Sequence, residues 1–195
     1  MTSKSSDPSP VRGLLLFPGA GASRDAPALV ALDRTLCDEM TVVRPDFPYR
    51  REGRKSPDRP AKAIACVGEE AALLAHRAGI DPAAVALGGR SFGGRMCSMA
   101  VAEGLPAAAL VLIAYPLHPP GKADRLRIEH FPDITVPCLF VSGTRDPFGT
   151  PDEFAAHTGA IAGPVTHGWV EGGRHDLKGS DDEVTVTVRD WLRGL

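Results

Sequence analysis

A serine flanked by glycines stands near the middle of the sequence, in the stretch Gly89-Arg90-Ser91-Phe92-Gly93. An apolar run, residues 84–87, precedes it, and a helix-forming run, residues 94–102, follows it. A G-x-S-x-G pattern between a buried strand and a helix is typical of a nucleophile elbow, a sharp turn that exposes the serine hydroxyl. So tight a turn needs residues without a Cβ on both sides. The pattern predicts Ser91 as a nucleophile; the alternative is a Gly-rich turn that only packs closely or cradles a phosphate.

An acid and a histidine that could complete a catalytic triad follow two later apolar runs. Asp146 comes after residues 137–142, and His175 comes after residues 165–171. The order Ser, Asp, His along the chain is the one found in α/β-hydrolases. Because the carboxyl ends of parallel strands meet at one edge of a sheet, we expect the three side chains to converge there. His175 would then accept the proton of Ser91 while Asp146 orients the imidazole.

Other acids and histidines offer alternative interpretations. Asp146 could instead cap the turn before Pro147, and Asp176 is the nearest alternative acid, although adjacent side chains usually diverge. Packing or surface roles are expected for the histidines inside predicted helices or strands, namely His76, His157 and His167.

The loops at the same edge of the sheet supply the expected oxyanion hole and substrate pocket. The backbone N–H groups of Phe92 and Ala20 are the expected oxyanion donors, each contributing roughly 3 kcal/mol, with Gly21 as the alternative to Ala20. The side chains expected to line the pocket are Tyr49, Arg90, Leu117, His118 and Phe148.

Strands that alternate with helices would position these residues. Alternation implies crossover connections and therefore a mostly parallel sheet with helices on both faces, a three-layer α/β sandwich. Pro45 places the second strand near an edge of the sheet. The stretch 116–136 is too short for a large helical lid. Six strands are expected at 11–17, 41–45, 85–89, 108–114, 137–142 and 165–171; helices at 25–40, 61–78, 94–102, 122–130, 151–161 and 181–192; and an Arg- and Pro-rich loop at 47–60.

Composition is that of an ordinary soluble protein, with 43% hydrophobic and 24% charged residues in 195. We expect residues 11–195 to form a single domain and the polar residues 1–10 to be a disordered tail. The tail lacks the apolar centre of a signal peptide, which predicts a cytoplasmic protein. The formal charge of −2 gives no general attraction to nucleic acid or membranes.

The four cysteines are widely scattered and form no C-x-x-C pair, so we expect neither a zinc site nor a disulfide framework. Each lies in an apolar or helical run, which predicts buried, reduced thiols. They are Cys37, Cys66, Cys97 and Cys138. No cofactor or metal is expected.

Six stretches carry a resemblance to a known family. The chain is similar to the small dienelactone-hydrolase-like α/β-hydrolases, especially the group that includes a testis-expressed hydrolase-like protein and a subunit of a chromatin-associated acetyltransferase complex. One departure is Ser91, because dienelactone hydrolases proper use a cysteine nucleophile. Another is Pro18, where many hydrolases have histidine. The matching stretches are 17–21, 47–49, 88–95, 115–122, 143–149 and 173–175.

The resemblance implies a minimal α/β-hydrolase that cleaves a carboxylic ester or related acyl bond of a small molecule. A thioesterase or peptidase would use the same residues, and some relatives in regulatory complexes suggest a non-catalytic binding or scaffolding module instead. Basic residues surround the expected site, so they could attract an anionic substrate or form structural ion pairs. They are Arg50, Arg51, Arg54, Lys55, Arg59, Arg90, Arg95 and Arg145.

Overall fold

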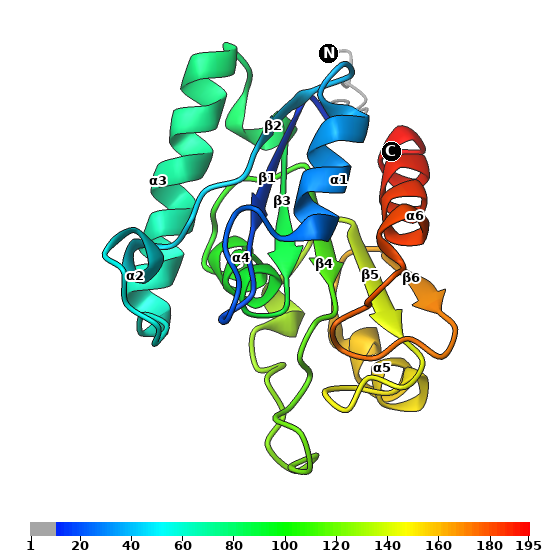
Figure 1. Cartoon of the computed structure of the whole chain (residues 1–195). Coiled ribbons are helices and arrows are strands. Elements are labelled where there is room, and N and C mark those ends of the chain that lie inside the picture. The colour runs from blue at the N-terminus through cyan, green and yellow to red at the C-terminus, as the bar shows by residue number, and fades with distance from the viewer. Residues whose placement is uncertain (1–10) are drawn as a thin grey trace, which may run out of the picture.

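Strands and helices alternate along the chain in the computed structural model, which describes residues 11–195 (Figure 1). The predicted disordered tail, residues 1–10, lies outside the described residues. The strands are β1 (Gly13–Phe17), β2 (Thr41–Val43), β3 (Val85–Arg90), β4 (Ala109–Ile113), β5 (Cys138–Gly143) and β6 (Val165–Val170). The helices are α1 (Pro27–Leu36), α2 (Pro48–Arg51), α3 (Pro60–Ala78), α4 (Phe92–Ala102), α5 (Pro151–His157) and α6 (Asp181–Arg193), with 3-10 turns at Pro82–Ala84, Phe131–Asp133 and Thr158–Ala160.

The six strands form one sheet in the order β2-β1-β3-β4-β5-β6, and every neighbouring pair is parallel. The prediction of an α/β fold with a parallel six-stranded sheet and no large lid is confirmed. β2 lies at an edge, as Pro45 predicted. Because the strands are parallel, all their carboxyl ends lie at the lower edge of the sheet in Figure 1.

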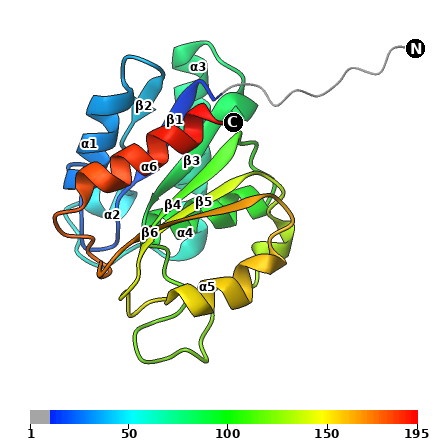
Figure 2. The same ribbon diagram turned by 90° about the vertical axis from the view of Figure 1, so that its right-hand side faces the viewer.

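Helices cover both faces of the sheet (Figures 1 and 2). In β1, Leu14 and Leu16 pack with residues of α1 and α6, while Leu15 and Phe17 pack with residues of α3 and α4. A strand covered on both faces has no polar side, which is why its sequence is an unbroken apolar run. Each such side chain contributes about 1.5–3 kcal/mol by burial.

Two sequence predictions about local structure are wrong and one needs refinement. Residues 122–130 are not helical, and the predicted loop 47–60 contains the single-turn helix α2. The helix predicted to reach residue 40 ends at Leu36. Residues 122–130 have good helix formers, so contacts with the rest of the domain override their local preference.

Three hydrogen bonds hold this irregular segment against the domain. The hydroxyl of Tyr115 donates to the carbonyl of Arg127 at 2.8 Å, and the Arg127 N–H donates to the carbonyl of Leu117 at 2.8 Å. Oγ of Ser98, in α4, lies 2.8 Å from Nε2 of His130. Since the Ser98 hydroxyl donates its one proton to the Arg95 carbonyl at 2.9 Å, it accepts a proton from His130 Nε2, which assigns the tautomer of that ring.

Three of the four cysteines are buried and the fourth, Cys37, is exposed, which corrects the prediction for Cys37. All four are free thiols. Burial raises the pKa of Cys66 to about 11 and that of Cys138 to about 12, so both stay protonated and act as small apolar side chains. Among residues 11–195, no helix has the length and apolar character needed to cross a membrane.

The buried imidazole of His130 predicts a pH dependence of stability. Burial and the nearby Arg95 guanidinium lower its pKa from 6.5 to about 4. Between these values the unfolded chain binds a proton that the folded chain does not, so the free energy of unfolding should fall as pH falls from about 6.5 to about 4. Urea denaturation of the wild type and of His130→Gln across this range checks this. His130→Gln should have the shallower pH slope, and equal slopes would contradict the assignment.

Candidate active site

Ser91 occupies a strained turn between β3 and α4. Its backbone has φ 50° and ψ −112°, a conformation that L residues rarely adopt and that costs about 1–3 kcal/mol. The turn is held on both sides, because the Ser91 N–H donates to the Ile113 carbonyl at 2.8 Å and the Arg95 N–H donates to the Ser91 carbonyl at 3.0 Å. The serine therefore stands where the sheet ends and the N-terminus of α4 begins.

The two glycines of the G-x-S-x-G pattern are required by contact with β1. A Cβ on Gly89, whose φ is 149°, would lie 2.1 Å from the Phe17 carbonyl oxygen. A Cβ on Gly93 would lie 2.4 Å from the same oxygen. Both distances are far below van der Waals contact, so the turn can pack on β1 only with glycine at both positions.

The loops that carry the acid and the histidine also meet through a glycine. A Cβ on Gly143, at the end of β5, would lie 2.2 Å from the Gly173 carbonyl oxygen. That oxygen accepts the Arg145 N–H at 2.9 Å, and Oγ1 of Thr144 accepts the Gly172 N–H at 2.8 Å. The loops after β5 and β6 are thus joined side by side, immediately before Asp146 and His175.

The three predicted triad residues form one hydrogen-bonded chain. Oγ of Ser91 lies 2.9 Å from Nε2 of His175, and Nδ1 of His175 lies 2.8 Å from Oδ2 of Asp146. The Asp146 side chain is fully buried, whereas 21% of the His175 side chain is exposed. A carboxylate accepts the Nδ1 proton, so Nε2 has the lone pair that can take a proton from the serine.

Phe148 fixes this chain from two directions. Its N–H donates to Oδ1 of Asp146 at 2.8 Å, and its ring stacks on the imidazole with centroids 3.9 Å apart. The first contact occupies the second carboxylate oxygen, and the second restricts the tilt of the histidine ring. The arrangement can transfer a proton from Ser91 to His175 without moving either side chain far.

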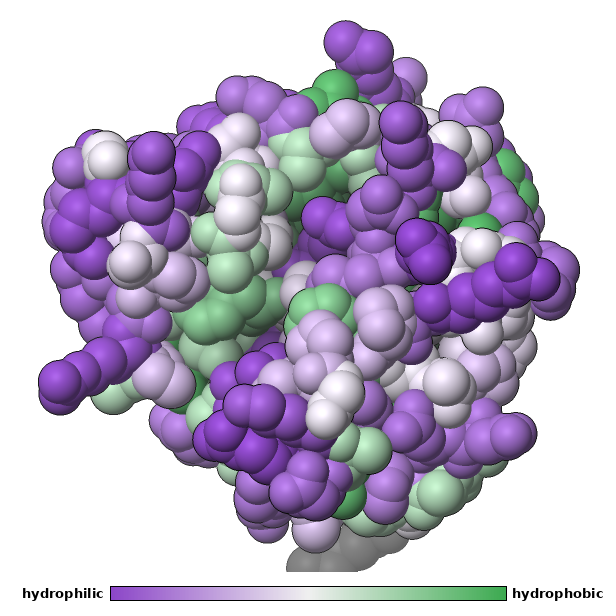
Figure 3. Space-filling model, turned by 60° about the horizontal axis from the view of Figure 1, so that its bottom comes forward, coloured by the Kyte–Doolittle hydropathy of each residue, from purple (hydrophilic) through white to green (hydrophobic). Residues whose placement is uncertain are grey.

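A cavity of about 590 Å³ lies in front of Ser91 and His175. Residues 19–22, Phe92 and Pro116 form part of its wall. Figure 3 brings the carboxyl ends of the strands toward the viewer and shows a hollow with apolar surface on one side and hydrophilic surface on the other. The site is open to solvent, as the absence of a large lid predicts.

Two of the five predicted pocket residues line this cavity, and the other three are buried outside its lining. Arg90 and Phe148 line it. Tyr49 and Leu117 are fully buried outside its lining. His118 is also buried, with Nδ1 2.9 Å from the Pro119 carbonyl and Nε2 3.1 Å from Oε1 of Glu153. A residue that comes directly after a strand lies near the site, but its position in the sequence does not determine which way its side chain points.

Arg127 and Pro116 line the cavity but were not among the predicted pocket residues. Arg127 arrives on the irregular segment that was predicted as a helix.

The predicted oxyanion donors have N–H groups that are not used elsewhere. Ala20 and Phe92 line the cavity, and within residues 11–195 neither N–H donates a hydrogen bond. Phe92 is the first residue of α4, where N–H groups have no acceptor within the helix. Gly21 shares both properties with Ala20, so the structure is compatible with either donor.

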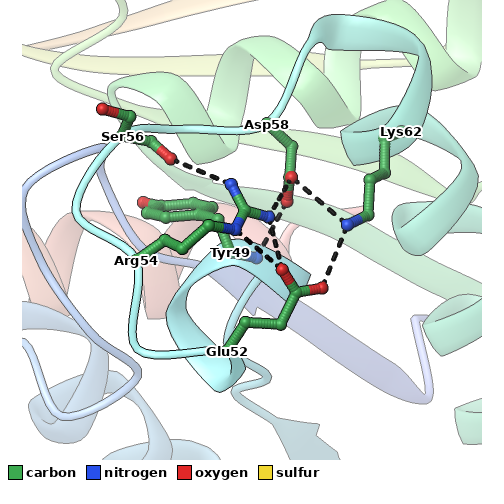
Figure 4. A network of polar contacts seen from close by, with 6 residues as sticks. All are labelled: Tyr49, Glu52, Arg54, Ser56, Asp58 and Lys62. Atoms are coloured by element: carbon green, nitrogen blue, oxygen red, sulfur yellow. Dashed lines mark hydrogen bonds and ion pairs between the residues drawn. The ribbon is translucent and has the colours of Figure 1, made fainter.

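Arg54, in the Arg- and Pro-rich loop 47–60 (the rim loop), and Lys62, at the start of α3, form structural ion pairs (Figure 4). Arg54 lies 2.6 Å from carboxylate oxygens of both Glu52 and Asp58, and Lys62 lies 3.1 Å from Glu52. Asp58 also accepts the Tyr49 N–H at 2.9 Å. The Tyr49 hydroxyl in turn donates to the Ala20 carbonyl at 2.7 Å, so this network supports the loop that carries the candidate oxyanion donor.

Comparison with known proteins gives one family. A family model described as an alpha/beta hydrolase domain matches residues 11–190. Solved structures share the fold at low identity. A protein of the alpha/beta hydrolase superfamily from Xanthomonas campestris pv. campestris has a TM-score of 0.71, with 21% identity over 94% of this chain and 99% of that chain.

Two further solved structures are similar. Est1E from Butyrivibrio proteoclasticus, solved with ferulic acid bound, has a TM-score of 0.79, with 14% identity over 96% of this chain and 90% of that chain. A dienelactone hydrolase from Anabaena variabilis has a TM-score of 0.74, with 19% identity over 96% of this chain and 88% of that chain.

The packing of the turn on β1 predicts a large cost for a single added methyl group. Gly93→Ala should lower the free energy of unfolding by about 1–3 kcal/mol or more, because the clash is with backbone that cannot move aside. Gly68→Ala in α3 is the matched control, since its Cβ would be 4.0 Å from the nearest atom. There alanine should stabilise the helix by up to about 1 kcal/mol. Urea denaturation measures both, and equal effects would contradict the packing argument.

Proposed function

Because this chain belongs to the alpha/beta hydrolase domain family, we propose that it is a serine hydrolase that cleaves a carboxylic ester or related acyl bond of a small molecule. The observation that carries the proposal is the hydrogen-bonded chain from Ser91 through His175 to Asp146 at the wall of an open cavity. A triad is recognised by such geometry and by the role of each group.

In the proposed mechanism, Nε2 of His175 takes the hydroxyl proton as Oγ of Ser91 attacks the substrate carbonyl carbon. The buried carboxylate of Asp146 stabilises the imidazolium that forms. The carbonyl oxygen becomes an oxyanion, which the N–H groups of Phe92 and Ala20 stabilise. His175 then gives its proton to the departing alkoxide, and an acyl group remains on Ser91.

The second half of the reaction repeats the same steps with water. His175 takes a proton from a water molecule as its oxygen attacks the acyl carbon, and the proton then returns to Oγ of Ser91. The carboxylic acid leaves, and the enzyme is restored.

Ser98 also contacts a histidine, His130, but it is poorly placed to act as a nucleophile. Ser98 is fully buried within α4, and its hydroxyl proton is already donated to the Arg95 carbonyl. It does not line the cavity in front of Ser91. It therefore provides a matched control for tests of the triad.

Covalent labelling tests the nucleophile. A fluorophosphonate probe should label the wild type and the Ser98→Ala variant but not Ser91→Ala. Ser91→Ala should also lower kcat for 4-nitrophenyl acetate by roughly four to six orders of magnitude, because no other hydroxyl can form the acyl intermediate. Asp146→Asn should lower kcat by about 10⁴-fold, because the imidazole loses its orientation.

The outcomes separate the alternatives. A wild type that is folded but neither labelled nor active would favour a non-catalytic binding or scaffolding module. Labelling that persists in Ser91→Ala would exclude Ser91 as the nucleophile. Circular dichroism of each variant confirms that the fold is retained.

The hydrogen bond from Tyr49 to Ala20 predicts a positioning role. Tyr49→Phe should lower kcat by about three- to tenfold, the loss expected for one hydrogen bond that holds the oxyanion loop, with little change in KM. Tyr115→Phe is the control, because its hydroxyl bonds to the Arg127 carbonyl instead. Steady-state kinetics on 4-nitrophenyl acetate and thermal denaturation measure both variants. If they lost stability and kcat equally, Tyr49 would have only a structural role.

A further inference from the structure

Three arginines line the cavity in front of Ser91, and no carboxylate of the described part of the chain lines it with them. They are Arg90, Arg95 and Arg127. Within residues 11–195, none of the three forms an ion pair. The cavity is therefore cationic in a protein whose formal net charge is −2.

Two of these arginines approach Ser91 from different elements. Arg95 lies one helical turn after Ser91, and its N–H bonds to the Ser91 carbonyl at 3.0 Å, which places both residues on one face of α4. Arg127 comes from the segment after β4, where both its backbone polar groups are bonded. Both residues line the same cavity, and burial and then the charge of Arg95 lower the pKa of Arg127, so each guanidinium group lies within the electrostatic field of the other.

The third arginine is already engaged. Nη2 of Arg90 donates to the His175 carbonyl at 2.7 Å, which supports the loop that carries the histidine. In contrast, Nε of Arg95 is buried without a hydrogen-bond partner among the described residues. The side chain of Arg127 has no hydrogen bond with them either.

Placing two unpaired cations close together in a partly buried site costs free energy. Burial, and after it the charge of Arg95, lower the pKa of Arg127. Asp124 and Glu129, on the outer side of the same segment, border a neighbouring hollow together with both arginines yet form no ion pair with either. The rim loop shows that this chain can pair its surface cations, as Arg54 does (Figure 4). Buried charges normally have partners.

We propose that the substrate is an ester that carries a carboxylate, which Arg95 and Arg127 bind while Ser91 attacks the ester carbonyl. Guanidinium groups match the planar geometry of a carboxylate and can bind it through two parallel hydrogen bonds. A low-dielectric wall concentrates their field in the cavity despite the net charge of the protein. This proposal rests on the proposed serine hydrolase function and narrows its substrate class.

Matched pairs of esters test the proposal. One pair is mono-4-nitrophenyl adipate and its methyl ester, with the charge on the acyl side. The other is 3-acetoxybenzoate and its methyl ester, with the charge on the leaving group. The wild type should prefer the charged member of at least one pair, and the ratio of the two kcat/KM values should fall as salt is added.

Variants of the two arginines locate the effect. Arg95→Gln and Arg127→Gln should each lower that ratio by roughly 10- to 100-fold, as charge-assisted hydrogen bonds are lost. Arg95→Lys and Arg127→Lys should lower it less, because the charge remains. Arg77→Gln is the control: it removes an equal charge from an exposed position of α3, outside the cavity, and should leave the ratio unchanged.

A binding measurement separates this proposal from the hydrolase assignment. Calorimetric titration of Ser91→Ala with adipate should show binding that Ser91→Ala/Arg127→Gln lacks, even if no ester is turned over. Inorganic phosphate as a competitor asks whether the site accepts other anions. Equal turnover of charged and neutral esters together with no adipate binding would overturn the carboxylate proposal and leave the hydrolase intact. Adipate binding by a protein that resists fluorophosphonate would refute only the hydrolase.

Discussion

The contact of backbone against backbone at the carboxyl edge of the sheet is the constraint on which the site depends. Gly89 and Gly93 both face the carbonyl of Phe17, and Gly143 faces that of Gly173. Because no side chain stands between these segments, the serine turn sits directly on β1, and the loops after β5 and β6 share hydrogen bonds. The strain of about 1–3 kcal/mol at a residue such as Ser91 persists only where its surroundings are this tightly fixed. The apolar core on both sides of β1, β3 and β4 supplies that rigidity.

Charge is used in two different ways around the cavity. Glu52 and Asp58 neutralise Arg54 of the rim loop and Lys62 of α3. Asp58 also holds Tyr49, whose hydroxyl donates to the Ala20 carbonyl, so this network has a structural role. At the cavity wall, Arg95 and Arg127 have no such partners among residues 11–195. The same residue type is therefore paired in the rim loop and unpaired at the cavity wall, and the difference lies in whether a carboxylate forms an ion pair with it. Composition cannot distinguish these cases, because it counts both sets alike.

The fold could be predicted from the sequence because each strand of a parallel sheet buried on both faces is a continuous apolar run. The run at residues 108–114 has no polar residue, and β4 is fully buried there. The sequence also predicted that Ser91, Asp146 and His175 lie at one edge of the sheet, because each follows the carboxyl end of a parallel strand. Sequence failed where tertiary contacts decide. Residues 122–130 have helical propensity but are held in an irregular conformation by Tyr115 and Ser98, and His118 turns inward to Glu153. These contacts join side chains to residues that are distant in sequence, so a local sequence pattern does not predict them.

The two serine and histidine contacts show what a proton acceptor needs beyond a short distance. They are nearly equal in length, 2.9 Å at Ser91 and 2.8 Å at Ser98. Behind His175 lies the carboxylate of Asp146, whose negative charge favours the imidazolium that a proton transfer creates. Near His130 lies the guanidinium of Arg95, which together with burial lowers the pKa of that imidazole to about 4. An imidazole with a lowered pKa is a weaker general base toward a serine hydroxyl. The charge beside the ring therefore adds to the differences between the serines themselves, since Ser98 is buried, donates its proton to a carbonyl and lies outside the cavity.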